Sequence, residues 1–352
     1  MNHNFKGGRE TVTLQHVGAR LGLSRTTISL ALRNHPRISA ATKRKVLAVA
    51  NELGYQPDQV ARALATGKSN LIGVVVPDIT DHFYAEVFRA IEKAANESGY
   101  HLVLSGTTHD PKQGDARIRE LVRLKIAGLI AAPPFTSENG PLPPFWKQIK
   151  RQRFPLVIIN RELTPAVFNQ VSIDNKSGIR MAVEMLARLG HKRVAYISGT
   201  PELIPIKQRL EAFRACAAQF GLEIDATLIE QSPHSVRGGY DSCARLWSRV
   251  RVKPTAILVF SDAPSLGVLR YLREHEIDVP KKVSVVGFDG TDSSEFSLTS
   301  LSTIVTPMYE MGEQAMRLLE KTMSQHYTRP QSILLPVRLE MRESVGPCTW
   351  SS

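Results

Sequence analysis

A group of polar and aromatic residues lies at or just after the ends of short apolar runs, where buried strands would deliver side chains to one place. Asp78 follows LIGVVVP, Arg161 follows PLVIIN, and Asp262 follows AILVFS. Arginine and carboxylate groups hold vicinal hydroxyls or anions through paired hydrogen bonds, and an aromatic ring covers the apolar face of a ligand ring. These residue types predict a site for a small hydroxyl-rich or anionic ligand. The candidates at these positions are Asp78, Phe83, Tyr84, Asn160, Arg161 and Asp262.

Three residues in or near this group also have simpler explanations. Asp262 is placed to cap a helix that starts at Ala263, and Asp174 is placed to cap the helix that follows it. Phe83 has the size and apolarity of an ordinary core residue. The sequence leaves both interpretations of Asp262 and Phe83 open.

The elements that must position these residues alternate between β-rich runs and amphipathic stretches. The strand candidates are LIGVVVP, HLVLSGT, GLIAAP, PLVIIN, RVAYISG, AILVFSD, VSVVGFD and LSTIVTP. Helical stretches such as 86–97 and 178–189 lie between most of them. This alternation predicts an α/β fold with parallel strands covered by helices on both faces, and a ligand site outside the carboxyl ends of the strands. One large sheet and two smaller sheets both fit, and the Pro-rich segment 133–145 reads as a surface loop.

Positive charge is concentrated at the start of the chain. The whole chain of 352 residues carries a net charge of +12. Residues 1–70 hold four Lys and seven Arg against three acidic residues, which leaves them at +8. A basic block ahead of a nearly balanced body predicts a module that binds a polyanion, although charge alone does not separate nucleic acid from a membrane surface.

The pattern inside this block predicts three short helices. Residues 13–21 have helical apolar spacing, Gly22 breaks the helix, and Ser24 caps a second helix over 25–32. A third helix begins after Ser39 and ends at Gly54. Two short helices joined by a tight turn, with small polar residues opening the second, are typical of a helix-turn-helix. A plain three-helix bundle with a solvated basic face is the alternative.

Several functional classes lack support in the sequence. No apolar run approaches the roughly 18 residues of a membrane span, and the first ten residues lack the apolar core of a secretion signal. The three cysteines have no metal-site spacing, so we expect neither disulfides nor a metal. The sequence contains no GxGxxG, HExxH or GxSxG motif and no complete phosphate-binding loop. We therefore expect a cytoplasmic protein that is not an enzyme, with no cofactor and no membrane partner.

The run VTLQHVGARLGLSRTTISLALRNHPRISAATKRKVLAVANELGYQPDQVARAL resembles, without a gap, the headpiece of the LacI/GalR transcriptional regulators. The resemblance implies that one set of residues reads bases in the major groove, namely Arg25, Thr26 and Leu30. It implies that a second set binds DNA phosphates, namely Thr13, Ser24, Thr27, Ser29, Ser39, Thr42 and Tyr55. Residues 58–66 would form a hinge helix that orders on DNA and contacts the minor groove through Ala61 and Leu64, with Leu64 as an apolar wedge.

Some positions depart from the family pattern. His16 and Gly18 stand where Asp and Ala are usual, and Arg33 and Asp58 each stand where Asn is usual. Asp58 matters most, because a carboxylate close to phosphate repels it unless the carboxylate caps the hinge helix. In the body, Asn160 replaces the usual Asp before Arg161.

The resemblance continues through GVVVPDITDHFYAEV, VSIDNKSG, LARLGHKRVAYISG, RLEAF and VPKKVSVVGFD, which are similar to the effector domain of the same family. It implies a two-lobed, doubly wound domain with the periplasmic-binding-protein fold, three crossovers near 160–163, 290–293 and 322–326, and effector contacts from Arg209 and Asp262. The expected organisation is a headpiece at 1–57, a hinge helix and linker at 58–70, the effector-binding and dimerisation domain at 71–340 and a tail at 341–352. Lobe one would hold about 71–160 and 291–322, and lobe two about 161–290 and 323–340.

The function implied is that of a sequence-specific DNA-binding regulator, in the first place a repressor. It would bind a near-palindromic, double-stranded operator as a homodimer, because the C-terminal leucine heptads of the family's tetramers are missing. A small effector in the cleft, a sugar or sugar derivative, would set operator affinity. The alternatives are a solute-binding protein of a transporter, which shares the body's fold, and an α/β enzyme with an incidental basic bundle.

Overall fold

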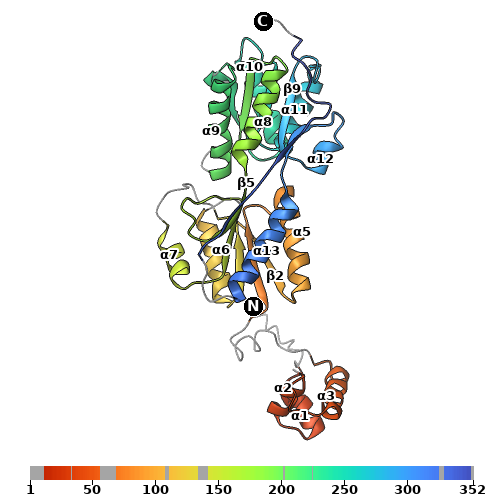
Figure 1. Cartoon of the computed structure of the whole chain (residues 1–352). Helices are drawn as coiled ribbons and strands as arrows, with labels where there is room; N and C mark the ends of the chain where they lie inside the picture. The colour runs from red at the N-terminus through yellow and green to blue at the C-terminus, as the bar shows by residue number, and fades with distance from the viewer. Residues whose placement is uncertain are drawn as a thin grey trace, which may run out of the picture. The chain divides into compact units, whose positions relative to one another are not determined.

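The computed structural model describes residues 12–32, 34–55, 69–107, 111–133, 142–200, 203–223, 225–324 and 329–349. The chain forms two compact units, Met1–Ser69 and Asn70–Ser352 (Figure 1). The predicted hinge helix 58–66, with Asp58, Ala61 and Leu64, lies outside the described residues, as do Arg33 and most of the Pro-rich loop.

The N-terminal unit contains the three predicted helices, α1 (Leu14–Leu21), α2 (Arg25–Leu32) and α3 (Ala40–Glu52). Their buried faces form one small core, which contains Val17, Ile28, Ala31, Val46 and Ala50. The predicted caps are present, since the Ser24 hydroxyl accepts a hydrogen bond from the Thr27 amide at 3.1 Å and the Ser39 hydroxyl accepts one from the Thr42 amide at 3.2 Å. Gly22 adopts a φ of 64°, which lets the chain leave α1 and turn sharply into α2.

The second unit holds two mainly parallel sheets of six strands each. This confirms the predicted α/β class and shows that the strands form two sheets, not one large sheet. In the first sheet the strand order is β11-β5-β4-β3-β1-β2, and every pair is parallel. Its strands are β1 (Leu71–Val76), β2 (His101–Gly106), β3 (Gly128–Ala131), β4 (Leu156–Ile159), β5 (Asn169–Ile173) and β11 (Ser332–Leu335). Its helices are α5 (His82–Glu97), α6 (Pro111–Arg123), α7 (Pro144–Arg151) and α13 (Met308–Ser324).

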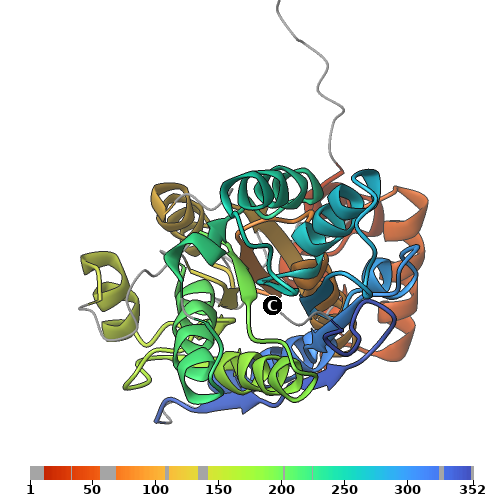
Figure 2. The same ribbon diagram turned by 90° about the horizontal axis from the view of Figure 1, so that it is seen from above.

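The second sheet has the order β12-β10-β9-β8-β6-β7, with the edge strand β12 antiparallel. Its strands are β6 (Val194–Ser198), β7 (Ile229–Gln231), β8 (Ala256–Val259), β9 (Ser284–Asp289), β10 (Ser302–Val305) and β12 (Arg338–Glu340). Its helices are α8 (Asn175–Arg188), α9 (Ile204–Gln219), α10 (Val236–Arg249), α11 (Asp262–Glu274) and the short α12 (Asp292–Glu295). Viewed from above, the helices surround the strands (Figure 2). The central strands are buried along their whole length, as a doubly covered sheet requires.

The three crossovers between the lobes lie one strand later than we predicted. The chain passes between the sheets after β5, between β10 and α13, and between β11 and β12. Lobe one therefore comprises 70–173 and 308–335, and lobe two comprises 174–305 and 338–349. The positions implied by the resemblance were too early, and for the first crossover β5 was not among the predicted strands, because it begins with the polar residues Asn169 and Gln170. Both are nevertheless buried, and the Gln170 amide hydrogen-bonds the backbone of Leu163 and the Ser332 hydroxyl.

The segment predicted as a tail packs against lobe two over its described part, 341–349. The Val285 amide donates to the Ser344 carbonyl oxygen at 2.8 Å, and the Cys348 amide donates to Leu189 at 2.8 Å. The three cysteines are free thiols, and no helix among the described residues is long and apolar enough to cross a membrane.

Candidate functional site

A cavity of about 330 Å³ lies between the two lobes, at the carboxyl ends of their strands. Lobe one contributes Pro77, Asp78, Asp81, Phe83, Tyr84, Asn160 and Arg161. Lobe two contributes Thr200, Leu203, Pro205, Ile206, Arg209, Pro233, His234, Phe260, Ser261 and Asp289. A few polar groups set among apolar and aromatic side chains are the usual lining of a small-molecule site.

The wall from lobe one is fixed where β4 ends. Asn160 has a φ of 52°, a left-handed conformation that asparagine tolerates better than most residues. Its amide nitrogen donates to the Tyr84 hydroxyl at 3.2 Å, and its Oδ1 is buried with no hydrogen-bond partner among the described residues. Arg161 is 2% exposed and donates to the carbonyl oxygens of Pro133 and Asn160. The guanidinium of Arg161 therefore holds the loop, and the Asn160 oxygen is left as an acceptor.

The wall from lobe two is organised around Arg209. Its Nε donates to Asn175 Oδ1 at 2.8 Å, and its Nη1 donates to the Phe260 carbonyl oxygen at 2.5 Å. The same guanidinium lies 3.7 Å from Asp289 Oδ1 and stacks over the Phe288 ring at 3.5 Å. Burial lowers the pKa of Arg209, and the neighbouring carboxylate of Asp289 opposes that shift.

A chain of polar contacts joins this wall to lobe one. Asp289 accepts a hydrogen bond from the Ser261 hydroxyl at 2.6 Å, and His234 Nε2 lies 2.8 Å from the same hydroxyl. On its other side, His234 Nδ1 lies 3.7 Å from Asp81 Oδ2, which caps α5 in lobe one. Burial raises the pKa of both Asp81 and Asp289, while His234 and Arg209 respectively oppose the rise. This series of contacts, from Asp81 at one end to Arg209 at the other, therefore joins the two sides of the cleft.

Six of the seven predicted ligand residues line this cavity, and Asp262 does not. The Asp262 side chain is fully buried and turned away from the cleft, where it accepts hydrogen bonds from the amides of Gly290 and Thr291 and from the Thr303 hydroxyl. The capping interpretation is also wrong, because Ser261 is the N-cap and Asp262 is the first residue of α11. Asp262 instead ties α11 to the loop after β9.

The main residues that the sequence analysis missed are Asp81, His234, Ser261 and Asp289. Asp289 ends the strand VSVVGFD, so the strand-end reasoning that selected Asp78 applies to it equally. His234 lies in the loop between β7 and α10 and carries no local pattern that predicts its position in the cleft.

In the N-terminal unit, the side chains that open α2 are available to a partner. Arg25 and Thr26 are exposed, and Leu30 is half-buried. Thr13, Ser24 and Ser39 are exposed at the starts of the three helices, while Thr27, Ser29, Thr42 and Tyr55 are half-buried. Helix starts present unpaired amides and favour anions such as phosphate. The histidine at position 16 has a local role, because its Nδ1 accepts a hydrogen bond from the Thr13 amide at 3.3 Å, at the start of α1.

A helix-turn-helix unit joined to a two-lobed α/β domain with a ligand-sized cleft defines the class of ligand-responsive DNA-binding proteins. Comparison with known families agrees with this class. Residues 13–58 match the model for bacterial regulatory proteins of the lacI family, and residues 183–345 match a periplasmic binding protein-like domain.

Individual relatives match over nearly the whole chain. The transcriptional regulator DegA of Bacillus subtilis is 32% identical over 95% of this chain and 98% of its own length. The transcriptional repressor CytR of Escherichia coli K12 is 30% identical over 94% of this chain and 96% of its own length. The solved lac repressor dimer bound to operator and the anti-inducer ONPF is 27% identical, with a TM-score of 0.83 over 96% of this chain and all of that chain. The chain belongs to the lacI family of bacterial regulatory proteins and is a DNA-binding transcriptional regulator.

Proposed function

We propose that this regulator is a repressor that binds a near-palindromic operator as a homodimer and responds to a small hydroxylated effector in the cleft. The observation that carries the proposal is the cavity itself, which both lobes line and which the contacts from Asp81 to Arg209 span. Two structural relatives support it, namely the lac repressor dimer on its operator and the regulator CelR in complex with cellobiose, which has a TM-score of 0.70 and 26% identity. No catalytic step is assigned to the cleft.

The charges in the cleft favour a neutral ligand over an anion. Asp78, Asp81 and Asp289 line the cavity, and both arginines there already bind backbone or side-chain oxygens of the protein. Among the described lining residues, an anionic ligand would meet three aspartates, while both guanidiniums are already engaged by oxygens of the protein. A sugar or sugar derivative instead offers hydroxyl donors for Asn160 Oδ1 and the carboxylates, and an apolar ring face for the aromatic side chains.

DNA recognition is assigned to the N-terminal unit. Arg25, Thr26 and Leu30 of α2 would read base edges, because they present a cation, a hydroxyl and an apolar group on the accessible side of the helix. The residues proposed to bind phosphates are Thr13, Ser24, Thr27, Ser29, Ser39, Thr42 and Tyr55. They would fix register and orientation without carrying sequence information. Ala61 and Leu64 are proposed for the minor groove.

Effector and operator would be coupled through the two lobes. A ligand that contacts both walls favours one separation of the lobes, and that separation changes how the hinge segments 58–66 of a dimer are presented to DNA. By thermodynamic linkage the DNA must change effector affinity by the same factor, typically 5- to 150-fold. An effector without this reciprocal effect would bind the protein but would not regulate it.

The test is a fluorescence anisotropy titration with the full chain. An operator selected from random duplexes is titrated with and without a panel of sugars and nucleosides, and Asp289→Asn is compared with Asp278→Asn, an exposed control in the same lobe. We expect one ligand class to shift operator affinity in the parent and the control but not in Asp289→Asn. A solute-binding protein would bind the ligand and show no specific DNA binding at all, which would overturn the proposal.

A further inference from the structure

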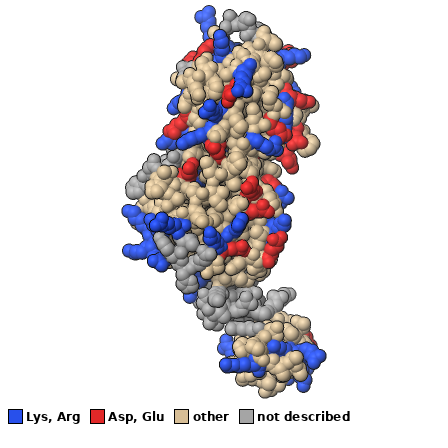
Figure 3. Space-filling view, viewed as in Figure 1, with Lys and Arg blue, Asp and Glu red and all other residues tan. Residues whose placement is uncertain are grey.

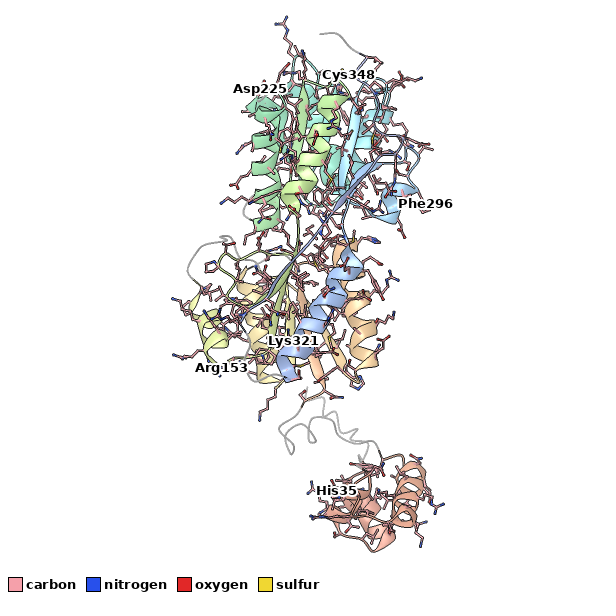
Figure 4. The ribbon with its side chains drawn as sticks, in the orientation of Figure 1. His35, Arg153, Asp225, Phe296, Lys321 and Cys348 are labelled. Carbon is pink, nitrogen blue, oxygen red and sulfur yellow. The ribbon has the colours of Figure 1, made fainter. Side chains whose placement is uncertain are left out.

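Helix α7 and the turn after it carry a cluster of cations on lobe one, here called the α7 surface: Lys147, Lys150, Arg151 and Arg153. All four side chains are exposed, and the sequence from 139 to 161 contains no Asp or Glu. The described ion pairs of lobe one join Arg89 to Glu86 and Arg117 to Glu120, and none of them includes Lys147, Lys150 or Arg151. Figure 3 shows Lys and Arg side chains gathered on this side of lobe one, and Figure 4 places Arg153 at its outer edge.

The α7 surface is concave. Its four cations line a hollow of about 730 Å³, and the other described residues that line it are apolar or neutral. These are Leu142, Phe154, Leu156, Ala166, Val167, Phe168, Asn169, Thr322 and Pro330. A hollow lined by several cations fits a ridge of negative charge.

Stabilisation of α7 does not account for this cluster. The buried face of α7 anchors the helix through Phe145, Trp146 and Ile149, and the Trp146 indole donates to Asp115 at 2.9 Å. Cations in the last turn of a helix also favour its C-terminal dipole, which explains Lys150 and Arg151. That effect falls off within one turn, so it gives no reason for Lys147, which lies before the last turn.

The α7 surface lies close to the point where the chain arrives from the DNA-binding unit. The Leu129 amide donates to the Pro155 carbonyl oxygen, and the Ala127 amide donates to the Leu71 carbonyl oxygen, so the segment after Arg153 is two strands away from the start of β1. At about 4.8 Å between neighbouring strands, this separation is roughly 10 Å. Leu71 lies two residues after Ser69, the last residue of that unit. DNA held by that unit is therefore tethered to this edge of the sheet, which gives it a high effective concentration there.

We propose that the α7 surface binds backbone phosphates of the DNA duplex that flanks the operator. The inference rests on the proposed operator binding and adds a second, sequence-independent contact to it. Each phosphate neutralised by a cation releases condensed counterions, so the contact raises affinity at low salt without contributing to base specificity. The effector domain would then help to hold the DNA as well as sense the ligand.

The experiment compares two duplexes that contain the same operator, one of about 20 base pairs and one extended by about 15 base pairs on each side. The variant is Lys147→Gln/Lys150→Gln/Arg151→Gln, and the matched control is Arg273→Gln/Lys281→Gln/Lys282→Gln, which removes the same charge from exposed positions on lobe two. With three contacts on each flank at about 0.9 in log–log salt slope each, the advantage of the long duplex should shrink about 40-fold between 50 and 200 mM salt for each flank that the homodimer engages, in the parent and the control. In the α7 variant the long and short duplexes should bind alike.

Four results would overturn the proposal. If the α7 variant loses the same affinity for both duplexes, the three cations do not act on the flanking DNA. If the lobe-two control loses as much affinity as the α7 variant, the effect comes from net charge alone. Binding of millimolar inorganic phosphate to the parent but not to the α7 variant, with equal parent affinities for the two duplexes, would mark the hollow as a small-anion site. Specific binding to the short duplex without any advantage for the long one refutes only this inference, whereas failure to bind either duplex specifically refutes the operator proposal itself.

Discussion

Asp262 makes the stability of lobe two depend on pH. Its carboxyl group is fully buried, and burial, with the nearby carboxylate of Asp289 adding to it, raises the pKa of Asp262 from 3.8 to about 6. A folded-state pKa above the unfolded value means that the protonated group stabilises the fold. This stabilisation is complete below pH 3.8 and is lost as pH rises through about 6. At about 1.36 kcal/mol per pKa unit the full loss is about 3 kcal/mol, and roughly half of it falls between pH 5 and pH 8.

Asp262→Asn isolates this contribution. The amide oxygen can accept from the Gly290 and Thr291 amides as the carboxylate does, and the amide nitrogen can donate to the Thr303 hydroxyl. The variant resembles the protonated acid and cannot ionise. We expect its free energy of unfolding in urea, followed by circular dichroism, to fall less between pH 5 and pH 8 than that of the parent, by about 1–2 kcal/mol.

The control for this measurement is Asp278→Asn, an exposed carboxyl group in the same lobe. It should keep the pH dependence of the parent. If Asp262→Asn keeps it too, Asp262 is ionised in the folded state throughout this range and the reasoning from burial is wrong.

Three further variants test separate parts of the structure. Gly239→Ala would place a Cβ 1.9 Å from the Pro264 carbonyl oxygen between α10 and α11, so it should lower the urea midpoint by the equivalent of about 1–3 kcal/mol, and an unchanged midpoint would contradict this packing. Arg209→Met leaves buried Asp289 without its cation and should cost about 3–5 kcal/mol of stability in the same assay, together with the effector response. Leu64→Ala should weaken operator binding far more than binding to random duplex, and equal losses would rule out a wedge in the minor groove.

Local patterns in the sequence predicted the N-terminal unit well. The caps at Ser24 and Ser39 and the helix end near Gly54 depend only on residues within a turn of one another, and the structure has all three. The eight apolar runs are all strands for the same reason. What local patterns could not supply was the partner of each strand. Gln170 is polar, but its buried side chain hydrogen-bonds the backbone of Leu163 in the same lobe. Because a local pattern does not reveal this contact, β5 was not predicted as a strand of lobe one.

In the cleft, too, local patterns predicted some residues correctly and missed those that depend on tertiary contacts. Strand ends located Asp78 and Arg161 correctly, because the carboxyl ends of parallel strands meet at one edge. The prediction for Asp262 was wrong by one position in the sequence. Ser261 faces the cavity, whereas the side chain of Asp262, at the start of α11, turns into the lobe. His234 reaches the cleft only because the loop before α10 packs beside Phe260, a tertiary contact that no short-range pattern encodes.

The central claim is that one chain recognises a specific DNA sequence and reads a small molecule in the cleft. The most direct test is selection of random duplex DNA by the full-length protein at moderate salt, repeated with a panel of sugars and nucleosides. We expect a palindromic motif of roughly 14–20 base pairs, two half-sites about one helical turn apart, whose enrichment changes with one ligand class. Failure to enrich any motif, with every ligand and without ligand, would contradict the account.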